Sequence, residues 1–341
     1  MSLAAAIRDR DVAEQPGRRD EGWRWTDLRG LIRKLPPPSE PFTSDVGDGP
    51  FDVLATDRRL IVNGRGAEPV EVARDSSAVV AARFVSRGAG THIARLNITL
   101  GANARLLLLE SYESDGGSLS EAALNITLGA GATVERVVLA EDHSEAVTVS
   151  QAEATLAARA TFGQTVIASG ARRQRLETRV LHPGGEAKLR LDGVYLLADK
   201  RHSDQTTVVT HAGTDGVTAQ LTKGVVRDQA RGVFQGRIVV EEGADRTDAR
   251  MGHHALILSD RAEVDAKPEL EIYADDVACA HGNTVGALDE DALFYARQRG
   301  MTEADARALL TEAFIGEVVD RIGHQGAREV VRAWVGERLR A

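Results

Sequence analysis

The sequence predicts a mainly β protein: a parallel β-helix whose rungs are about 28 residues long, with helical segments at both ends. The first observation is a repeat, because LNITLGA occupies residues 96–102 and returns at residues 124–130, 28 positions later (124 − 96). The second is the alternation of apolar and polar residues inside the repeat, which is the period of a strand with one buried face. The third is a turn that recurs at nearly equal intervals, as in stacked repeats.

Apolar columns justify the rungs when the chain is written in rows of 28. Leu100, Leu128 and Leu156 share one such column. Each coil of a solenoid must complete one circuit before it stacks on the previous coil, about 4.8 Å away, and this keeps the rhythm constant. An antiparallel sandwich with regular hairpins is the alternative, although hairpins do not require rows of equal length. The recurring turn occupies residues 183–188, 212–217 and 242–247.

In chain order, we expect an N-terminal helical segment with a linker (1–50), the solenoid core (51–287) and a C-terminal helical domain (288–341). Residues 17–35 look helical up to the prolines that follow, and residues 37–50 read as the linker. The corners are expected to use glycine, because positive φ is often required there. Helical ends are expected to cap the solenoid, whose edge strands are otherwise open.

The solenoid is expected to run from about Ile61 to Gly286, with Val70 and Val72 one period before the first repeat. Beyond it, the apolar period becomes helical. Apolar residues at spacings of three and four predict one helix, and a second helix is expected over residues 325–339. The predicted stripe of the first helix comprises Ala306, Leu309, Leu310, Ala313, Phe314, Glu317 and Val318.

The composition favours a cytoplasmic protein that binds neither nucleic acid nor a membrane. The net charge of −9, with both signs mixed along the chain, argues against nucleic-acid binding. The single cysteine permits no intrachain disulfide, and the chain has neither a signal-peptide core nor an apolar run of about 20 residues. No lysine precedes Ser or Thr, so no P-loop ATP site is expected. The lysines are Lys34, Lys188, Lys200, Lys223 and Lys267.

Most of the histidines are expected to be structural. His253 and His254 are neighbours on a predicted strand, so their side chains point to opposite faces and are poor partners for one metal ion. His182, His202 and His211 fall at turns or rung edges, where solvated side chains are expected.

One segment carries the residue types of a metal site. EIYADDVACAHGNTVG (271–286) places Cys279 and His281 two residues apart, so on a strand they share one face, about 6.5 Å apart at the backbone. Thiolate and imidazole are ligands for zinc, copper and iron–sulfur species. Two ligands cannot complete a four-ligand site. Either a partner chain supplies the others, or the pair is structural.

Four segments carry a family resemblance: PGRRDEGWRWTDL (16–28), LTKGVVRDQARGVFQGRIVVEEGADRTDA (221–249), residues 256–300 and ARALLTEAFIGEV (306–318). They are similar to the SufD family of the SUF iron–sulfur cluster assembly machinery. This resemblance implies a right-handed parallel β-helix that is a scaffold and not an ATPase. It also implies pairing with a SufB-like β-helix and docking of a SufC-like ABC ATPase on the C-terminal helices.

The resemblance also implies a site. By motif match, Cys279 and His281 fall on the family's Cys-x-His, which makes them candidate iron ligands of a transient iron–sulfur cluster shared with the SufB-like subunit. Of the two, His281 is the stronger candidate ligand. The resemblance places ATP chemistry in the SufC-like subunit and links the assembled complex to reduced flavin, for which no residue here is assigned. A homodimer is the alternative state of the chain alone.

Two functions of other classes stay open. One is a β-helix carbohydrate-active enzyme, a lyase or hydrolase, which usually has a secretion signal and aromatic sugar platforms. This chain has no such signal, and aromatic residues are 4% of it. The other is a homodimeric structural β-helix without a cluster site. Association with an ATPase subunit distinguishes the scaffold from both.

Overall fold

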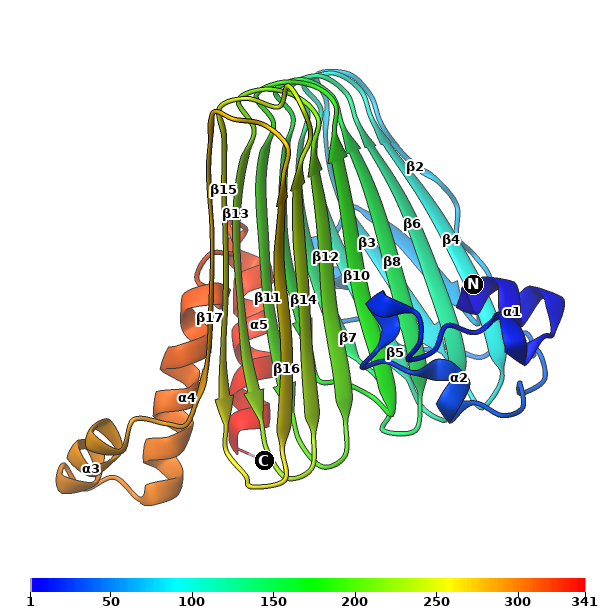
Figure 1. Ribbon diagram of the computed structural model, residues 1–341. Helices are drawn as coiled ribbons and strands as arrows, with labels where there is room; N and C mark the ends of the chain where they lie inside the picture. The colour runs from blue at the N-terminus through cyan, green and yellow to red at the C-terminus, as the bar shows by residue number, and fades with distance from the viewer. Residues whose placement is uncertain (1, 341) are drawn as a thin grey trace.

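The computed structural model describes residues 2–340 and is dominated by two parallel sheets that face each other across a shared core (Figure 1). The odd sheet orders nine strands from β1 through β3, β5 and so on to β17, and the even sheet orders eight strands from β2 to β16. Consecutive strands alternate between the sheets, so each rung contributes one strand to each sheet. The predicted parallel β-helix is confirmed.

The strands begin and end close to the predicted solenoid limits. Val70 and Val72 lie in the first even strand and pair with Ile98 and Leu100, as their position in the period predicted. The odd sheet contains β1 (Asp57–Val62), β3 (Ser77–Ser86), β5 (Arg105–Ser114), β7 (Thr133–Glu141), β9 (Thr161–Ala168), β11 (Lys188–Leu197), β13 (Val217–Val226), β15 (Thr247–Ile257) and β17 (Val277–Gly286). The even sheet contains β2 (Val70–Val72), β4 (Thr91–Leu100), β6 (Leu119–Leu128), β8 (Val147–Leu156), β10 (Arg173–His182), β12 (His202–His211), β14 (Arg231–Val240) and β16 (Glu263–Ile272).

The two copies of the repeated segment lie side by side in register. Leu96 pairs with Leu124, and Leu100 pairs with Leu128, which in turn pairs with Leu156 on the next rung. All five side chains are at most 2% exposed, because they point between the two sheets. Burying one leucine contributes about 1.5–3 kcal/mol. The column of stacked leucines is therefore a major part of the solenoid core.

A second column runs through one corner of the solenoid, where each residue adopts a left-handed backbone conformation. The N–H of each corner residue donates to the carbonyl that precedes the corresponding residue of the next rung, at 2.6–3.0 Å. Only one residue of this corner column is a glycine. The expectation that glycines occupy the corners is therefore wrong for this corner. Asn and Asp tolerate the conformation better than most residues. The corner column comprises Asp75, Asn103, Gly131, Arg159, Glu186, Asp215 and Arg246.

The N-terminal segment packs on the outer face of the even sheet through short elements. The helix predicted over residues 17–35 is wrong, because only η2 (Glu21–Trp23) and α2 (Leu28–Leu31) are helical there. Tertiary contacts override the helical pattern, since Trp23 stacks on Arg175 at 4.4 Å and the Thr26 hydroxyl donates to Asp204 at 2.5 Å. The other elements are α1 (Leu3–Asp9), η1 (Val12–Glu14) and η3 (Asp52–Leu54).

The C-terminal helices are α3 (Glu290–Gln298), α4 (Glu303–Val319) and α5 (Gln325–Arg340), which include the predicted second helix. In Figure 1, α4 and α5 run along the odd sheet and α3 projects away from it. Ile315 and Val318 of α4 belong to one apolar cluster with Leu109 and Ile167 of the sheet. The Lys223 ammonium also donates to Glu317 of α4 at 2.5 Å.

Two expectations about these helices are wrong. They cover the outer face of the odd sheet instead of capping the last rung, because that face already presents an apolar surface for them to bury. The buried stripe of α4 is rotated from the predicted one. Ala306 and Val318 are buried, whereas Ala313 is exposed and Leu309 is 49% exposed.

The last rung is consequently an open end. β16 and β17 each have a neighbouring strand on one side only. Large apolar side chains remain exposed close to these strands: Ile272 is 42%, Tyr273 64% and Val285 44% exposed. Within residues 2–340, no helix combines the length and the apolar character needed to cross a membrane.

Candidate functional site

Cys279 and His281 lie on β17, the last strand of the odd sheet, and face the interior of the solenoid. Cys279 pairs with Ala249 of β15, and His281 pairs with Met251. Both partners are buried core residues between the two sheets. Because pairing in a parallel ladder keeps equivalent side chains on one face, Cys279 and His281 continue the inner columns of the core.

These two inner columns end at the open rung, so side chains that would otherwise be core reach solvent. Cys279 is half-buried against the core, and burial raises the pKa of its thiol. His281 is exposed. The thiol and the imidazole therefore sit at the mouth of the solenoid, where another molecule can approach them.

The site is incomplete in this chain. Within residues 2–340, no group of three or more His, Cys, Asp or Glu side chains is arranged to hold a metal ion. An iron–sulfur cluster normally takes four protein ligands. Cys279 and His281 could therefore serve a cluster only together with ligands from a second molecule.

His253 and His254 point to opposite sides of β15, as predicted. His253 is buried, hydrogen-bonds to the Tyr195 hydroxyl at 2.8 Å and to the Asn283 side-chain oxygen at 2.6 Å, and burial lowers its pKa to about 4. His254 hydrogen-bonds on the other side to the Thr284 hydroxyl at 2.7 Å.

The expectation that His182, His202 and His211 are solvated is wrong. His182 and His211 are 0% exposed and continue the column of Leu100, Leu128 and Leu156, with their rings hydrogen-bonded to each other. The polar turn that follows each of these two histidines suggested solvent, but each histidine is the last residue of its strand and points inward.

His202 is buried for a different reason. It lies on the outer face of the even sheet, where the N-terminal segment covers it, and its Nε2 hydrogen-bonds to the Trp25 carbonyl at 3.0 Å. Burial lowers the pKa of His202 to about 4.

We expect the His182–His211 pair to make the fold acid-sensitive. Burial lowers both pKa values, that of His211 to about 3, so both rings stay neutral in the folded state while the unfolded chain protonates near pH 6.5. Stability is therefore present above pH 6.5 and is lost as the pH falls, by up to about 1.4 kcal/mol per pH unit for each ring. The His182→Leu/His211→Leu variant should show a shallower loss in urea melts from pH 6.5 to 5. An unchanged slope would contradict this account.

A buried ion pair lies inside the solenoid and was not found from the sequence. Arg136 donates to the Glu110 carboxylate at 2.6 and 2.8 Å, and Glu110 also accepts from the Tyr112 hydroxyl at 3.1 Å. Glu110 is 0% exposed and Arg136 is 2% exposed. The sequence feature that could have revealed this pair is Glu110, a charged residue that directly follows RLLLL. It occupies an inward-facing position after the inward-facing Leu106 and Leu108.

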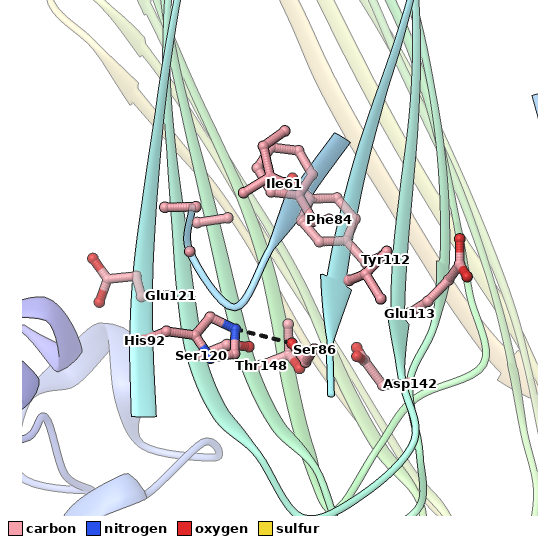
Figure 2. Close-up of a pocket in the computed structure, with 14 residues that line it drawn as sticks. Ile61, Phe84, Ser86, His92, Tyr112, Glu113, Ser120, Glu121, Asp142 and Thr148 are labelled. Atoms are coloured by element: carbon pink, nitrogen blue, oxygen red, sulfur yellow. Dashed lines mark hydrogen bonds between the residues drawn. The ribbon is translucent and has the colours of Figure 1, made fainter. Parts of the chain in front are cut away.

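A small cavity, lined mostly by apolar surface with a few polar side chains, lies between the sheets near the N-terminal rungs (Figure 2). His92 hydrogen-bonds to the hydroxyls of Ser86 at 3.0 Å and Ser39 at 2.9 Å, and burial lowers its pKa to about 4. Glu121 points away from His92 in Figure 2, and burial raises its pKa to about 7. The cavity volume of about 20 Å³ suits one water molecule and excludes a substrate.

The comparison with protein families agrees with this architecture. The family described as "SUF system FeS cluster assembly, SufBD core domain" matches residues 84–314, about two thirds of the chain. The match includes the rungs from β4 to β17 and the helices α3 and most of α4. It therefore contains both Cys279 and His281.

Curated relatives give the same picture. The iron-sulfur cluster assembly protein SufD of Escherichia coli is 38% identical over 156 residues, 46% of this chain and 37% of that protein. The SufBD family protein slr0076 of Synechocystis is 37% identical over 153 residues, 45% of this chain and 34% of the relative. The chloroplastic protein ABCI7 of Arabidopsis thaliana is 30% identical over 167 residues, 49% and 35% of the two chains.

The aligned regions span about a third of the length of these curated relatives. The resemblance to SufD found in the sequence is confirmed at the level of the family. A solenoid of paired parallel sheets, a Cys-x-His segment on its last strand and a family match over most of its rungs all agree. The chain belongs to the SufBD family of SUF iron–sulfur cluster assembly proteins.

Proposed function

We propose that this chain is a scaffold subunit of the SUF machinery that helps to build nascent iron–sulfur clusters and leaves ATP hydrolysis to a partner. The observation that carries the proposal is the open last rung within the family-matched region, which presents Cys279 and His281 at its mouth. The cluster is the substrate of this function. The chain's own contribution is to hold iron at these two side chains while a partner supplies the other ligands.

The open end is suited to a SufB-like β-helix. The unpaired edges of β16 and β17 offer backbone donors and acceptors that another strand can pair with. The exposed Ile272, Tyr273 and Val285 add apolar area at the same end. A second solenoid placed there would bring its own side chains opposite Cys279 and His281 and could complete four-fold coordination.

The C-terminal helices are suited to a SufC-like ABC ATPase. On α3, Phe294 is 64% and Tyr295 is 60% exposed, and Leu309 of α4 is 49% exposed. Aromatic side chains of this kind are typical anchors of protein interfaces. Because α4 is joined to the odd sheet through Ile315 and Val318, movement of a docked ATPase would be transmitted to the solenoid. Reduced flavin belongs to the same proposal only at the level of the complex, and a homodimer is expected when the partners are absent.

The test is His281→Ala in the complex co-expressed with its SufB-like and SufC-like subunits under anaerobic conditions. We expect a tagged variant to retain both partners and its melting temperature, because His281 is exposed and carries no core packing. Iron and sulfide in the purified complex should fall at least about ten-fold, because changing even a residue that only orients a metal ligand typically costs about 10–100-fold in metal affinity or activity. Complementation of a SUF-deficient strain should fail.

His254→Ala is the matched control, because His254 lies on the neighbouring strand and points away from the proposed site. It should retain cluster content and complementation. Cys279→Ser should have a smaller effect than His281→Ala. Full activity of His281→Ala, or a loss that only follows a lowered melting temperature, would overturn the proposed site. Failure to co-purify either partner would overturn the scaffold function itself.

A further inference from the structure

An open, positively charged cavity lies between the N-terminal segment and the start of β10, and neither Cys279 nor His281 lines it. Its volume is about 590 Å³. Its charged lining consists of five arginines and one aspartate, although the whole chain carries a net charge of −9. The lining residues with charge are Arg18, Arg19, Arg29, Arg33, Arg173 and Asp27.

Two carboxylates near the cavity accept hydrogen bonds from backbone N–H groups. Asp27 accepts a hydrogen bond from the Gly30 N–H at 2.7 Å and thereby caps α2. Asp20 accepts from the Gly17 N–H, also at 2.7 Å, and so fixes the turn that carries Arg18 and Arg19. These contacts fix the conformation of the arginine-bearing segment.

Arg173 is the half-buried member of the cluster. Its Nη1 donates to the Arg172 carbonyl at 2.7 Å, whereas its Nε is shielded from solvent and has no hydrogen-bond partner within residues 2–340. Burial lowers the pKa of Arg173, the charges of Arg231 and Arg172 lower it further, and the charge of Asp27 raises it. Positive charges therefore outnumber negative ones around this half-buried cation, and an added anion would stabilise it.

Two other buried arginines of this chain form ion pairs with carboxylates, unlike Arg173. Arg136 pairs with Glu110 at 2.6 Å, and Arg175 pairs with Asp204 at 2.6 Å. Over the residues that the structure describes, no carboxylate lies within ion-pair distance of Arg173, Arg18, Arg19 or Arg33. In this cavity, the fold has therefore gathered five guanidinium groups around a lining that contains one carboxylate, that of Asp27.

We infer that the cavity binds a small phosphate-bearing ligand, with Arg173 and the Arg18–Arg19 turn as the main contacts. Arginine forks match the oxygens of phosphate groups and donate charge-assisted hydrogen bonds in pairs. The volume exceeds that of a single phosphate and accommodates a diphosphate or a small phosphate ester. This site is independent of the cluster-building role proposed above.

The experiment is titration of the purified full chain at low ionic strength, with sodium pyrophosphate and separately with ADP, by calorimetry. We expect saturable binding that weakens with added salt. Arg173→Gln should raise the Kd at least about ten-fold, because it removes a charged hydrogen-bond donor. Since Arg173 is half-buried, the exposed pair Arg18→Gln/Arg19→Gln provides a second test, with the melting temperature of each variant recorded.

Arg105→Gln, an exposed arginine of β5 in the odd sheet, is the charge-matched control and should keep the Kd within about two-fold of the wild-type value. Tighter binding of ADP would favour an organic phosphate as the ligand, tighter binding of pyrophosphate would favour an inorganic one, and equal binding would show that only the shared diphosphate is recognised. All three results support the site. No saturable binding, or an equal loss in Arg105→Gln, would overturn the proposal.

Discussion

Replacing Leu128 by aspartate is expected to prevent stable folding of the solenoid. Leu128 is 1% exposed and stacks between Leu100 and Leu156 inside the sheets. The substitution removes about 1.5–3 kcal/mol of apolar burial and adds the cost of an unpaired buried carboxylate. Together these exceed about 5 kcal/mol, which is comparable to the whole stability of a typical domain. The measurement is soluble yield and the urea midpoint.

Thr127→Asp is the control, because it introduces the same charge at the adjacent position. Thr127 lies on the same strand but faces solvent, and its neighbours in the ladder are Thr99 and Thr155. We expect a change of less than about 1 kcal/mol, as for most exposed substitutions. If both variants lost the same stability, the assignment of inner and outer columns would be wrong.

Breaking the buried ion pair should have the next largest effect. Arg136→Met leaves Glu110 charged and enclosed, and removing one partner of a buried pair typically costs about 3–5 kcal/mol. Glu110→Leu/Arg136→Met should recover most of that loss, because Tyr112 keeps its hydrogen bond to Ser150, at 2.9 Å. Urea midpoints of the wild type, the single variant and the double variant provide the comparison.

A matched exposed pair gives the scale for this result. Arg250 and Asp248 form an ion pair at 3.1 Å, with the Arg250 side chain 72% exposed. Arg250→Met should cost less than about 1 kcal/mol, because solvent screens such pairs. A similar cost for Arg136→Met would mean that the interior pair is hydrated, and a double variant no more stable than the single one would mean that its hydrogen bonds dominate.

The solenoid was predictable because its information is periodic and local. The alternation of Leu96–Leu100 and the return of the same residues at Leu124–Leu128 specify both the strand and its partner. The position of Cys279 and His281 on one face followed from the same period. Their possible use in binding a cluster came from the family resemblance and from no geometry within this chain.

The errors arose where long-range contacts decide the structure. The fate of residues 17–35 depends on Arg175 and Asp204, which are more than a hundred residues away in the chain. The helix α4 covers the odd sheet because the outer face of that sheet is apolar. The sequence pattern of one strand does not show which of its two apolar faces points outward. The turn after His182 suggested a solvated side chain. His182 is buried because it continues the inner column of Leu100, Leu128 and Leu156.

The corner column limits how the length of this protein can change. Its residues are spaced by 28, 27, 29 and 31 positions at different rungs (131 − 103, 186 − 159, 215 − 186, 246 − 215), while the paired strands keep their register. Single-residue insertions and deletions are therefore absorbed outside the sheets. A change of a whole rung would instead shift everything beyond it by about 4.8 Å along the stack. Partners that contact both the N-terminal cover and the last rung would consequently constrain the number of rungs far more strictly than the number of residues.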